Sequence, residues 1–391
     1  MGNLISAVLS GAYTQWILPF LFVLTVIVLF HELGHYLVAR WCGIKVSTFS
    51  LGFGSELVGF TDRKGTRWKI SAIPLGGYVK FFGDENAASA PDLDKLAAMT
   101  AEERRQSFPG QPVANRAAVA IAGPLVNFIL AIAIFAGVAM VWGQTTGNTR
   151  IGGVEPGSPA AAAGIKAGDV IVDIAGTKVA TFDDVARIVG GNPGRPLAIN
   201  VNRDGAVTAV SATPADYDHR GRLGISSSRD PADLTTRAVT PLEAAEIGSE
   251  QTWYIISGTL GALRDMVLGK RAAGDDVGGM IKIAEYAGLA AKLGFDKLLA
   301  FTAMLSASIG LFNLFPIPVL DGGHLLFCLI EAVKGRPLSE RAQEVSFRIG
   351  LAAIMTLIVL VNGHDVWQKI FPAACPPTGC VENQAAPPAH P

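Results

Sequence analysis

The sequence predicts an α-helical polytopic membrane protein with an inserted soluble α/β domain. Half of its 391 residues are hydrophobic and only 17% are charged, whereas about a quarter of the residues of an ordinary soluble protein are charged. The mean hydropathy of +0.38 agrees with this class. Four long apolar runs contain much of the hydrophobic sequence, and short β-patterned stretches fill a segment between the second and the third run.

The four apolar runs are predicted to be transmembrane helices. They cover approximately residues 16–40, 115–142, 297–320 and 349–367. A helix rises 1.5 Å per residue, so such runs cross a hydrocarbon core of roughly 30 Å. Pro316 and Pro318 break the ladder of the third run near its far end. Backbone freed in this way is tolerated in a membrane only where it is buried in protein or lines a wet cavity. We therefore expect Asp321 to be presented from an unwound segment in a polar pocket.

The charge distribution predicts the orientation of these spans. Residues 1–30 carry no charged side chain, so they lack the basic segment of a signal peptide and are interpreted as leading into a retained span. The segment 40–116 is rich in Lys and Arg, which by the positive-inside rule makes it cytoplasmic. The N-terminus, the inserted domain and the C-terminus then lie on the outer side. A net charge of -1, without a dense basic tract, gives no reason to propose a nucleic-acid partner.

The first span contains the motif H-E-L-G-H. His31 and His35 are four residues apart, so both imidazoles can reach one metal ion from the same helix face, with Glu32 beside it. Catalytic zinc usually has three protein ligands and one open position, so a third ligand must come from elsewhere. Asp321 is the best candidate because both motifs lie in the cytoplasmic halves of their spans, and His324 is the alternative. Glu32 would act as the general base toward the attacking water.

A β-hairpin is predicted for residues 67–82, behind the first span. Alternating Trp68, Ile70 and Ala72 precede a turn at 74–77, and a second β-patterned stretch follows it. Two roles are open for this element. It is either a structural flap or a sheet edge that accepts an extended peptide by strand addition.

The segment 148–228 is predicted to be a separate soluble domain. Its stretches 151–160 and 163–176, followed by a short helix at 181–189, resemble a PDZ domain. Such domains bind extended peptides, often C-termini, by adding them to the edge of a sheet. The N-terminal membrane part, residues 1–147, precedes this domain.

Residues 229–296 are expected to form an amphipathic juxtamembrane region. Apolar residues recur at helical spacing from 241 to 270, but Arg264 and Asp265 interrupt them. These charges favour a helix on the membrane surface over a further span.

The C-terminal membrane part is predicted to cover residues 297–371. The tail at 372–391 is rich in proline and is expected to be disordered. Cys375 and Cys380, in this tail, either form a local disulfide in an oxidising compartment or remain free thiols.

Several motifs together resemble those of the bacterial site-2 protease family. They are the H-E-L-G-H of 31–35, the G-P-L-V-N of 123–127, the PDZ-like segment and the N-x-x-P-x-P-x-L-D-G-G run of 313–323. The similarity covers nearly the whole chain and is greatest to the regulator-of-sigma-E protease type. This resemblance implies an intramembrane zinc metalloprotease whose third ligand is Asp321.

The resemblance also implies a substrate-binding region. Asn313 is expected to hold substrate near the zinc, with Pro316 and Pro318 of the same run. The hairpin corresponds to a membrane-associated β element on the cytoplasmic side, which favours substrate contact by Gly76, Gly77 and Tyr78 over the flap role. No cofactor other than zinc is implied.

The implied function is regulated intramembrane proteolysis in a bacterial inner membrane. The substrates would be transmembrane segments of single-span proteins, such as anti-sigma factors after a first cut or remnant signal peptides. Peptide or protein C-termini at the PDZ domain and membrane lipid would be the other partners. The N-terminus, the PDZ domain and the C-terminus would be periplasmic, and the active site would lie toward the cytoplasm.

Two functions of other classes compete with this one. A catalytically silent PDZ scaffold would have no use for four ionisable residues, His31, Glu32, His35 and Asp321, inside a membrane, where such groups are costly. A metal transporter would need ligands reachable from both sides and would not require the base of the motif. The residues therefore favour a protease.

Overall fold

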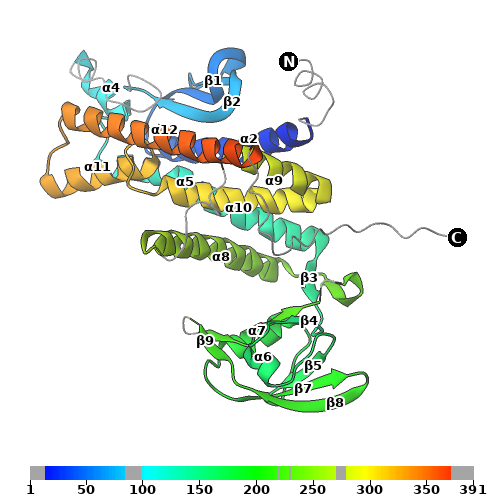
Figure 1. The fold of residues 1–391 in the computed structure, drawn as a ribbon. Coiled ribbons are helices and arrows are strands. Elements are labelled where there is room, and N and C mark those ends of the chain that lie inside the picture. Colours follow the sequence, from blue (N-terminus) through cyan, green and yellow to red (C-terminus); the bar gives the residue numbers. More distant parts are fainter. Residues whose placement is uncertain (1–13, 84–97, 218–219, 229, 270–278, 371–391) are drawn as a thin grey trace. The chain divides into compact units, whose positions relative to one another are not determined.

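The computed structural model describes residues 14–83, 98–217, 220–228, 230–269 and 279–370 (Figure 1). It is mostly helical, with small β-sheets. The chain forms two compact units, one of residues 1–135 and 245–391 and the other of residues 136–244. The predicted tail at 372–391, with Cys375 and Cys380, lies outside the described residues.

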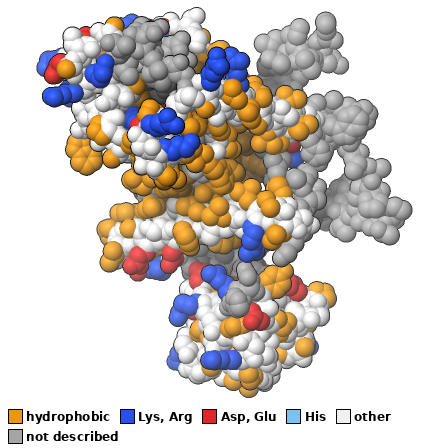
Figure 2. Space-filling model, turned by 90° about the vertical axis from the view of Figure 1, so that its left-hand side faces the viewer, with side chains coloured by type: hydrophobic (Ala, Val, Ile, Leu, Met, Phe, Trp, Pro, Cys, Tyr) orange, Lys and Arg blue, Asp and Glu red, His pale blue; other side chains and the backbone are white. Residues whose placement is uncertain are grey.

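Four helices of the described chain are long and apolar enough to cross a membrane, which agrees with the four predicted spans. These helices are α2 (Thr14–Trp41), α5 (Val113–Trp142), α10 (Phe295–Asn313) and α12 (Glu340–Ile370). Most residues in the apolar stretches of these helices are not buried, and in α12 only 6% of them are. Figure 2 shows hydrophobic side chains gathered over the helices of this unit. Such surfaces suit contact with lipid tails.

The third span ends earlier than predicted. Helix α10 stops at Asn313, not near residue 320, and a new helix, α11 (Asp321–Lys334), begins at Asp321. Pro316 and Pro318 explain the break, because proline lacks an N–H and disfavours helical backbone in the preceding residue. Asp321 is thus the first residue of a helix and does not lie within the unwound segment. Helix α11 was not predicted.

The predicted hairpin over 67–82 is wrong in its pairing. Strands β1 (Val46–Thr61) and β2 (Arg67–Phe81) form one curled sheet, in which residues 48–51 pair both with 67–70 and with 77–80. The two halves of the predicted hairpin therefore flank another segment and do not pair with each other. The actual turn is at 62–66, where the Asp62 carboxylate accepts hydrogen bonds from the N–H groups of Lys64 and Thr66.

The sheet of β1 and β2 packs against the first span. Phe49, Val79 and Phe81 belong to one buried apolar cluster with Ala39 of α2. A Cβ at Gly77 would lie 2.8 Å from a methyl group of Val28 and 3.1 Å from Cγ of Glu32. This close approach brings the C-terminal half of β2 beside the H-E-L-G-H motif.

Three further helices of the helical unit lie in the part of the chain that the structure describes. They are α4 (Ala101–Gln106), α8 (Pro241–Val267) and α9 (Met280–Leu293). Helix α8 confirms the predicted helix at 241–270. Helix α9 packs on α2, with Gly288 against Trp16. Asp365 of α12 accepts a hydrogen bond from the Gly279 N–H at the start of α9 and pairs with Lys282.

In the described chain, the second unit is built from short strands, the small helices α6 and α7, and a short 3-10 helix. Its central sheet is antiparallel with the order β6-β5-β7-β8, and the pairs β3/β12, β4/β11 and β9/β10 are separate. The strands are β3 (Gln144–Gly147), β4 (Ile151–Val154), β5 (Val170–Ile174), β6 (Thr177–Lys178), β7 (Leu197–Arg203), β8 (Ala206–Ala212), β9 (Ala215–Tyr217), β10 (Arg220–Arg222), β11 (Ile225–Ser227) and β12 (Leu234–Arg237), and the helices are α6 (Pro159–Ala162), α7 (Phe182–Gly190) and the short η1 (Pro231–Asp233). Its core includes Ile151, Ile171, Ile174, Ile199 and Val201.

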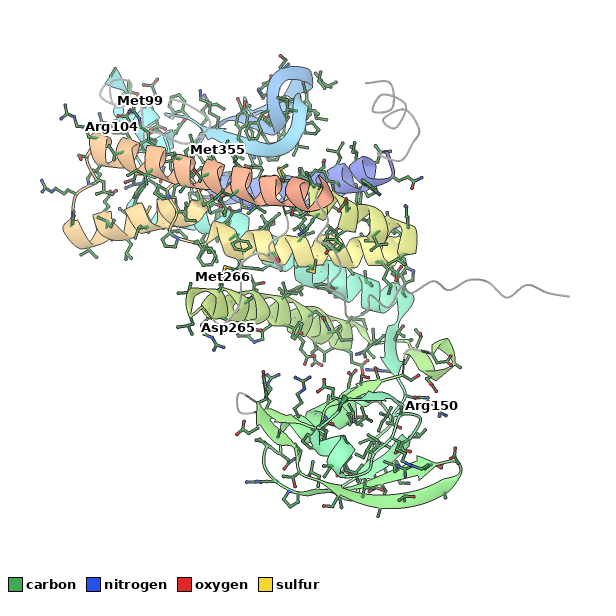
Figure 3. The ribbon with its side chains drawn as sticks, viewed as in Figure 1. Met99, Arg104, Arg150, Asp265, Met266 and Met355 are labelled. Atoms are coloured by element: carbon green, nitrogen blue, oxygen red, sulfur yellow. The ribbon has the colours of Figure 1, made fainter. Side chains whose placement is uncertain are left out.

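Two arginines tie the loops of this unit together. Arg150, labelled in Figure 3, donates to the carboxylate of Asp233 at 3.0 Å and to the carbonyl oxygen of Gly168 at 3.0 Å. Arg203 donates two hydrogen bonds of 2.7 Å to Asp169, whose side chain is 2% exposed. The Lys166 N–H also donates to Asp169. These bonds lower the pKa of the Asp169 carboxyl.

We expect Asp169→Asn to lower the opening free energy of this unit by about 1.5–3 kcal/mol at pH 7, the range for hydrogen bonds to a charged group. Since the folded pKa lies below the unfolded value of about 3.9, the stabilisation is complete above that value and is lost as the pH falls through the folded pKa. The difference in opening free energy between parent and variant should therefore shrink as the pH falls through the folded pKa of Asp169. Native-state hydrogen exchange of β5 and β7 measures both effects. Asp204→Asn, at an exposed position, is the control, and an equal loss in that variant would contradict the expectation.

Candidate metal centre

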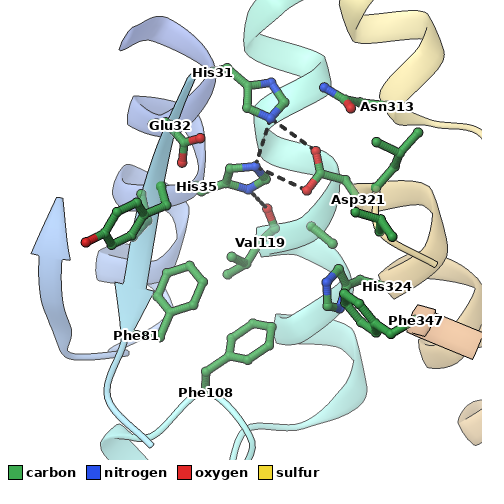
Figure 4. Close-up of a pocket in the computed structure, with 16 residues that line it drawn as sticks. His31, Glu32, His35, Phe81, Phe108, Val119, Asn313, Asp321, His324 and Phe347 are labelled. Atoms are coloured by element: carbon green, nitrogen blue, oxygen red, sulfur yellow. Dashed lines mark hydrogen bonds and ion pairs between the residues drawn. The ribbon is translucent and has the colours of Figure 1, made fainter. Parts of the chain in front are cut away.

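Helix α2 presents both histidines of the motif on one face. The two Nε2 atoms of His31 and His35 lie 3.2 Å apart, as spacing by one helical turn allows (Figure 4). His35 is buried, with 8% of its surface exposed, and Glu32 lies beside the pair. The sequence-predicted motif is therefore arranged around one point.

Asp321 meets this pair from α11. Its carboxylate oxygens lie 3.2 Å from Nε2 of His31 and 3.3 Å from Nε2 of His35. Metal–ligand bonds of about 2.0–2.2 Å at tetrahedral angles separate neighbouring ligand atoms by roughly 3.3–3.6 Å. Among the described residues, His31, His35 and Asp321 form the group that could hold a metal ion. Their donor types and spacing fit zinc.

Helix α5 supports the histidines through its backbone. The Nδ1 atom of His35 lies 2.8 Å from the carbonyl oxygen of Val119, an acceptor that directs the Nε2 lone pair toward Asp321. Gly123 lies against both rings, and a Cβ there would overlap Nε2 of His35 and lie 2.7 Å from Cε1 of His31. Val119 was not predicted as a partner of His35, because the position of a backbone carbonyl cannot be read from the residue types. Gly123 was visible only as part of the G-P-L-V-N motif.

The three potential ligands open onto a cavity of about 240 Å³. Its wall also includes Glu32, Gly77, Tyr78, Asn313 and His324, with the aromatic side chains of Phe81, Phe108 and Phe347. The cavity thus brings together groups from the two predicted halves of the site and from β2. Its mixed polar and aromatic wall can hold a peptide segment away from bulk water.

Three predicted substrate residues do not belong to the wall of this cavity as the structure describes it. Gly76 adopts a φ of +116°, and a Cβ there would lie 2.7 Å from the Phe53 ring. Pro316 and Pro318 form the break after α10, and Pro318 packs against Gly350 of α12.

His324, the alternative ligand, lies one helical turn after Asp321. Its ring centroid is 5.8 Å from that of Phe347 and 6.4 Å from that of Phe327. The potential ligand group of the described residues does not include it. The geometry therefore favours Asp321 over His324 as the third metal-binding group.

Comparison with known proteins places this site in a family. The model of peptidase family M50 matches residues 19–357. The chain belongs to peptidase family M50. A protein of Rhizobium meliloti named "putative zinc metalloprotease" is 45% identical to it over 362 residues, which cover 90% of this chain and 96% of that protein. A protein of Brucella suis with the same description is 46% identical over 360 residues, which cover 90% of this chain and 95% of that protein. Metalloprotease MmpA of Caulobacter vibrioides is 39% identical over 386 residues, which cover 90% of this chain and 96% of that protein.

The chain is accordingly a multi-pass membrane zinc metalloprotease similar to the site-2 proteases. The predictions of a metalloprotease and of zinc as its cofactor are confirmed at this level. Membership of a protease family favours neither the silent scaffold nor the metal transporter.

We expect Gly123→Ala to reduce zinc binding strongly, because its Cβ would push the imidazoles apart. Peptidase activity should fall in parallel. Gly137→Ala is a matched control in the same helix, since its Cβ would meet nothing within 4 Å, and it should bind zinc as the parent does. Zinc content of the purified proteins by elemental analysis measures this. Full zinc occupancy in Gly123→Ala would show that the rings do not bind metal in this arrangement.

Proposed function

We propose that this chain is an intramembrane endopeptidase of the regulator-of-sigma-E type, which cuts transmembrane segments of single-span membrane proteins. Anti-sigma factors after a first cut and remnant signal peptides are the substrate classes we favour. The observation that carries the proposal is the meeting of His31, His35 and Asp321 beside Glu32, in a cavity between helices that qualify as membrane spans.

In this proposal His31, His35 and Asp321 hold zinc, which supplies a Lewis acid when bound. Glu32 is the general base, whose carboxylate takes a proton from the attacking water and delivers it to the leaving amine. Its position supports this role, because it lies on the same helix as the two histidines and in the wall of the same cavity. The surrounding aromatic side chains restrict bulk water.

Substrate recognition requires an extended peptide, because a helical substrate hides its carbonyls in its own hydrogen bonds. We propose that the edge of β2 at Tyr78–Lys80 takes such a stretch by strand addition and that Asn313 holds it near the zinc. Gly77, Tyr78 and Asn313 all line the cavity, which supports this role.

The other predicted substrate residues are proposed to act indirectly. Gly76 would shape the strand that leads into the cavity, since its φ of +116° suits glycine. Pro316 and Pro318 would act by ending α10, so that Asn313 and Asp321 stand on either side of the break.

We further propose that residues 148–228 form a PDZ domain that binds peptide or protein C-termini. The strand pattern and the short helix α7 support this. Strands β11 and β4 pair with each other, and this pair offers a potential peptide-binding edge. Residues 1–147 and 297–371 are proposed as the two membrane parts of the protease domain, 229–296 as an amphipathic juxtamembrane region and 372–391 as a tail.

The proposed location is a bacterial inner membrane. The N-terminus, the PDZ domain and the C-terminus would face the periplasm, and the metal centre would lie toward the cytoplasm. The basic segment after α2 supports this orientation.

Glu32→Gln tests the assigned chemistry. The variant keeps the size of the side chain but removes the base, so we expect full zinc content and a cleavage rate lower by about 10²–10⁴-fold. Cleavage of a transmembrane reporter in proteoliposomes, together with elemental analysis, measures both. A variant that still cleaves at the parental rate would overturn the mechanism. Trapping of substrates on this variant in native membranes would identify its clients.

Helix-breaking residues in a substrate should raise its cleavage rate, because they lower the free energy needed to unwind it. Two reporter spans of equal length and hydropathy, one with a Gly-Pro pair and one with Ala-Leu in its place, make the comparison. Initial rates under the same conditions are the measurement. Equal rates would argue against a requirement for unwinding at β2.

A further inference from the structure

Asn127 of α5 is a buried amide beside a potential metal ligand. Its side-chain Nδ2 lies 3.2 Å from Nδ1 of His31, and the residue has no exposed surface. Its backbone carbonyl accepts a 2.9 Å hydrogen bond from Ser306 of α10. Asn127 thus contacts α2 through its side chain and α10 through its backbone, and its amide either packs two helices or serves His31.

The two histidines have different partners at Nδ1. An imidazole that binds metal through Nε2 carries its proton on Nδ1 and needs an acceptor there. His35 has such an acceptor in the Val119 carbonyl, at 2.8 Å. For His31 the Asn127 amide is the partner at this atom. It presents its NH₂ group, which suits the tautomer whose proton lies on Nε2 and faces Asp321.

The amide oxygen of Asn127 indicates a second role, as a hydrogen-bond acceptor. Within the described chain, the buried Oδ1 of Asn127 has no hydrogen-bond partner. A carboxamide has nearly the same shape after its oxygen and nitrogen exchange places. After this exchange Oδ1 would face His31 and accept the Nδ1 proton that the metal-bound ring must carry.

We propose that Asn127 is a positioning residue for the metal centre, which accepts the His31 Nδ1 proton when zinc is bound and donates to Nδ1 when it is not. This inference rests on the proposed role of His31 as a zinc ligand. The amide suits both states, since a carboxamide carries a donor and an acceptor and can serve either tautomer of the ring. Asn127 acts through His31 and does not touch the reacting atoms.

A packing role and a positioning role predict opposite orders for two substitutions. Asn127→Asp keeps an acceptor for the Nδ1 proton but buries a carboxylate, which is costly unless it is paired. Asn127→Leu keeps a similar shape without any acceptor. If Asn127 only packs helices, the Leu variant should resemble the parent more closely. If it positions His31, the Asp variant should bind zinc better than the Leu variant.

Zinc affinity of the purified full chain, measured by competition with a chromophoric chelator, decides between them. We expect Asn127→Leu to bind zinc about 10–100-fold more weakly, the usual effect of losing such a partner, and Asn127→Asp to stay within about threefold of the parent. Ser306→Ala is the matched control, because it removes a contact with the same residue but none with the ring, and it should bind as the parent does. Thermal unfolding in excess chelator reports the folding of each variant.

Parental zinc affinity in Asn127→Leu would overturn the proposal, as would an Asn127→Asp variant that folds but binds zinc more weakly than the Leu variant. If Asn127→Leu does not fold, the Asp variant still decides, because a more than tenfold loss of affinity in it contradicts the proposed acceptor. His31→Ala separates this proposal from the ligand assignment. Unchanged zinc binding in His31→Ala would refute the role of His31 as a ligand. Weakened binding in His31→Ala would support that role, and the zinc affinities of the Asn127 variants then decide the proposal.

Discussion

The helical unit depends on holding two imidazoles and one carboxylate at a single point among apolar helices. Ionisable groups are costly in such surroundings unless they are paired or bind metal. His31 and His35 come from α2, whereas Asp321 comes from α11, almost three hundred residues later in the chain. Helix α5 lies against both rings and supplies the Val119 carbonyl. The arrangement of these three helices is therefore the requirement that the other elements meet.

Glycine makes this arrangement possible because the helices approach more closely than side chains would allow. A Cβ at Gly34 would lie 2.6 Å from the carbonyl oxygen of Ala122, and one at Gly310 would lie 3.0 Å from that of Pro124. Gly123 leaves room for the histidine rings. Small residues at helix contacts are typical of membrane proteins, where packing and not the hydrophobic effect joins the helices. In this chain the contact at Gly123 lies at the candidate metal centre.

Local patterns in the sequence predicted a large part of this structure. The four spans follow from runs of apolar residues, and the pairing of His31 with His35 follows from helical spacing. The sheet was not predicted correctly. Residues 48–51 lie between the two stretches that were predicted to pair as a hairpin, and they pair with both. Long-range packing determines this pairing, so the local pattern does not show it. Helix α11 was missed because the apolar run continues across the break. The contact of Asn127 with His31 joins residues far apart in the chain, so local patterns do not show it.

The break between α10 and α11 links the fold to the chemistry of the site. It follows from two prolines, which end α10 at Asn313 and let a new helix begin at Asp321. A helix N-terminus carries a partial positive charge, so a carboxylate in its first turn is stabilised in the ionised form that a metal requires. Gly322 and Gly323 let the start of α11 fold back against the backbone of residues 314–318. An uninterrupted helix would carry Asp321 about 12 Å beyond Asn313 at 1.5 Å per residue, whereas both residues line the same cavity in this fold.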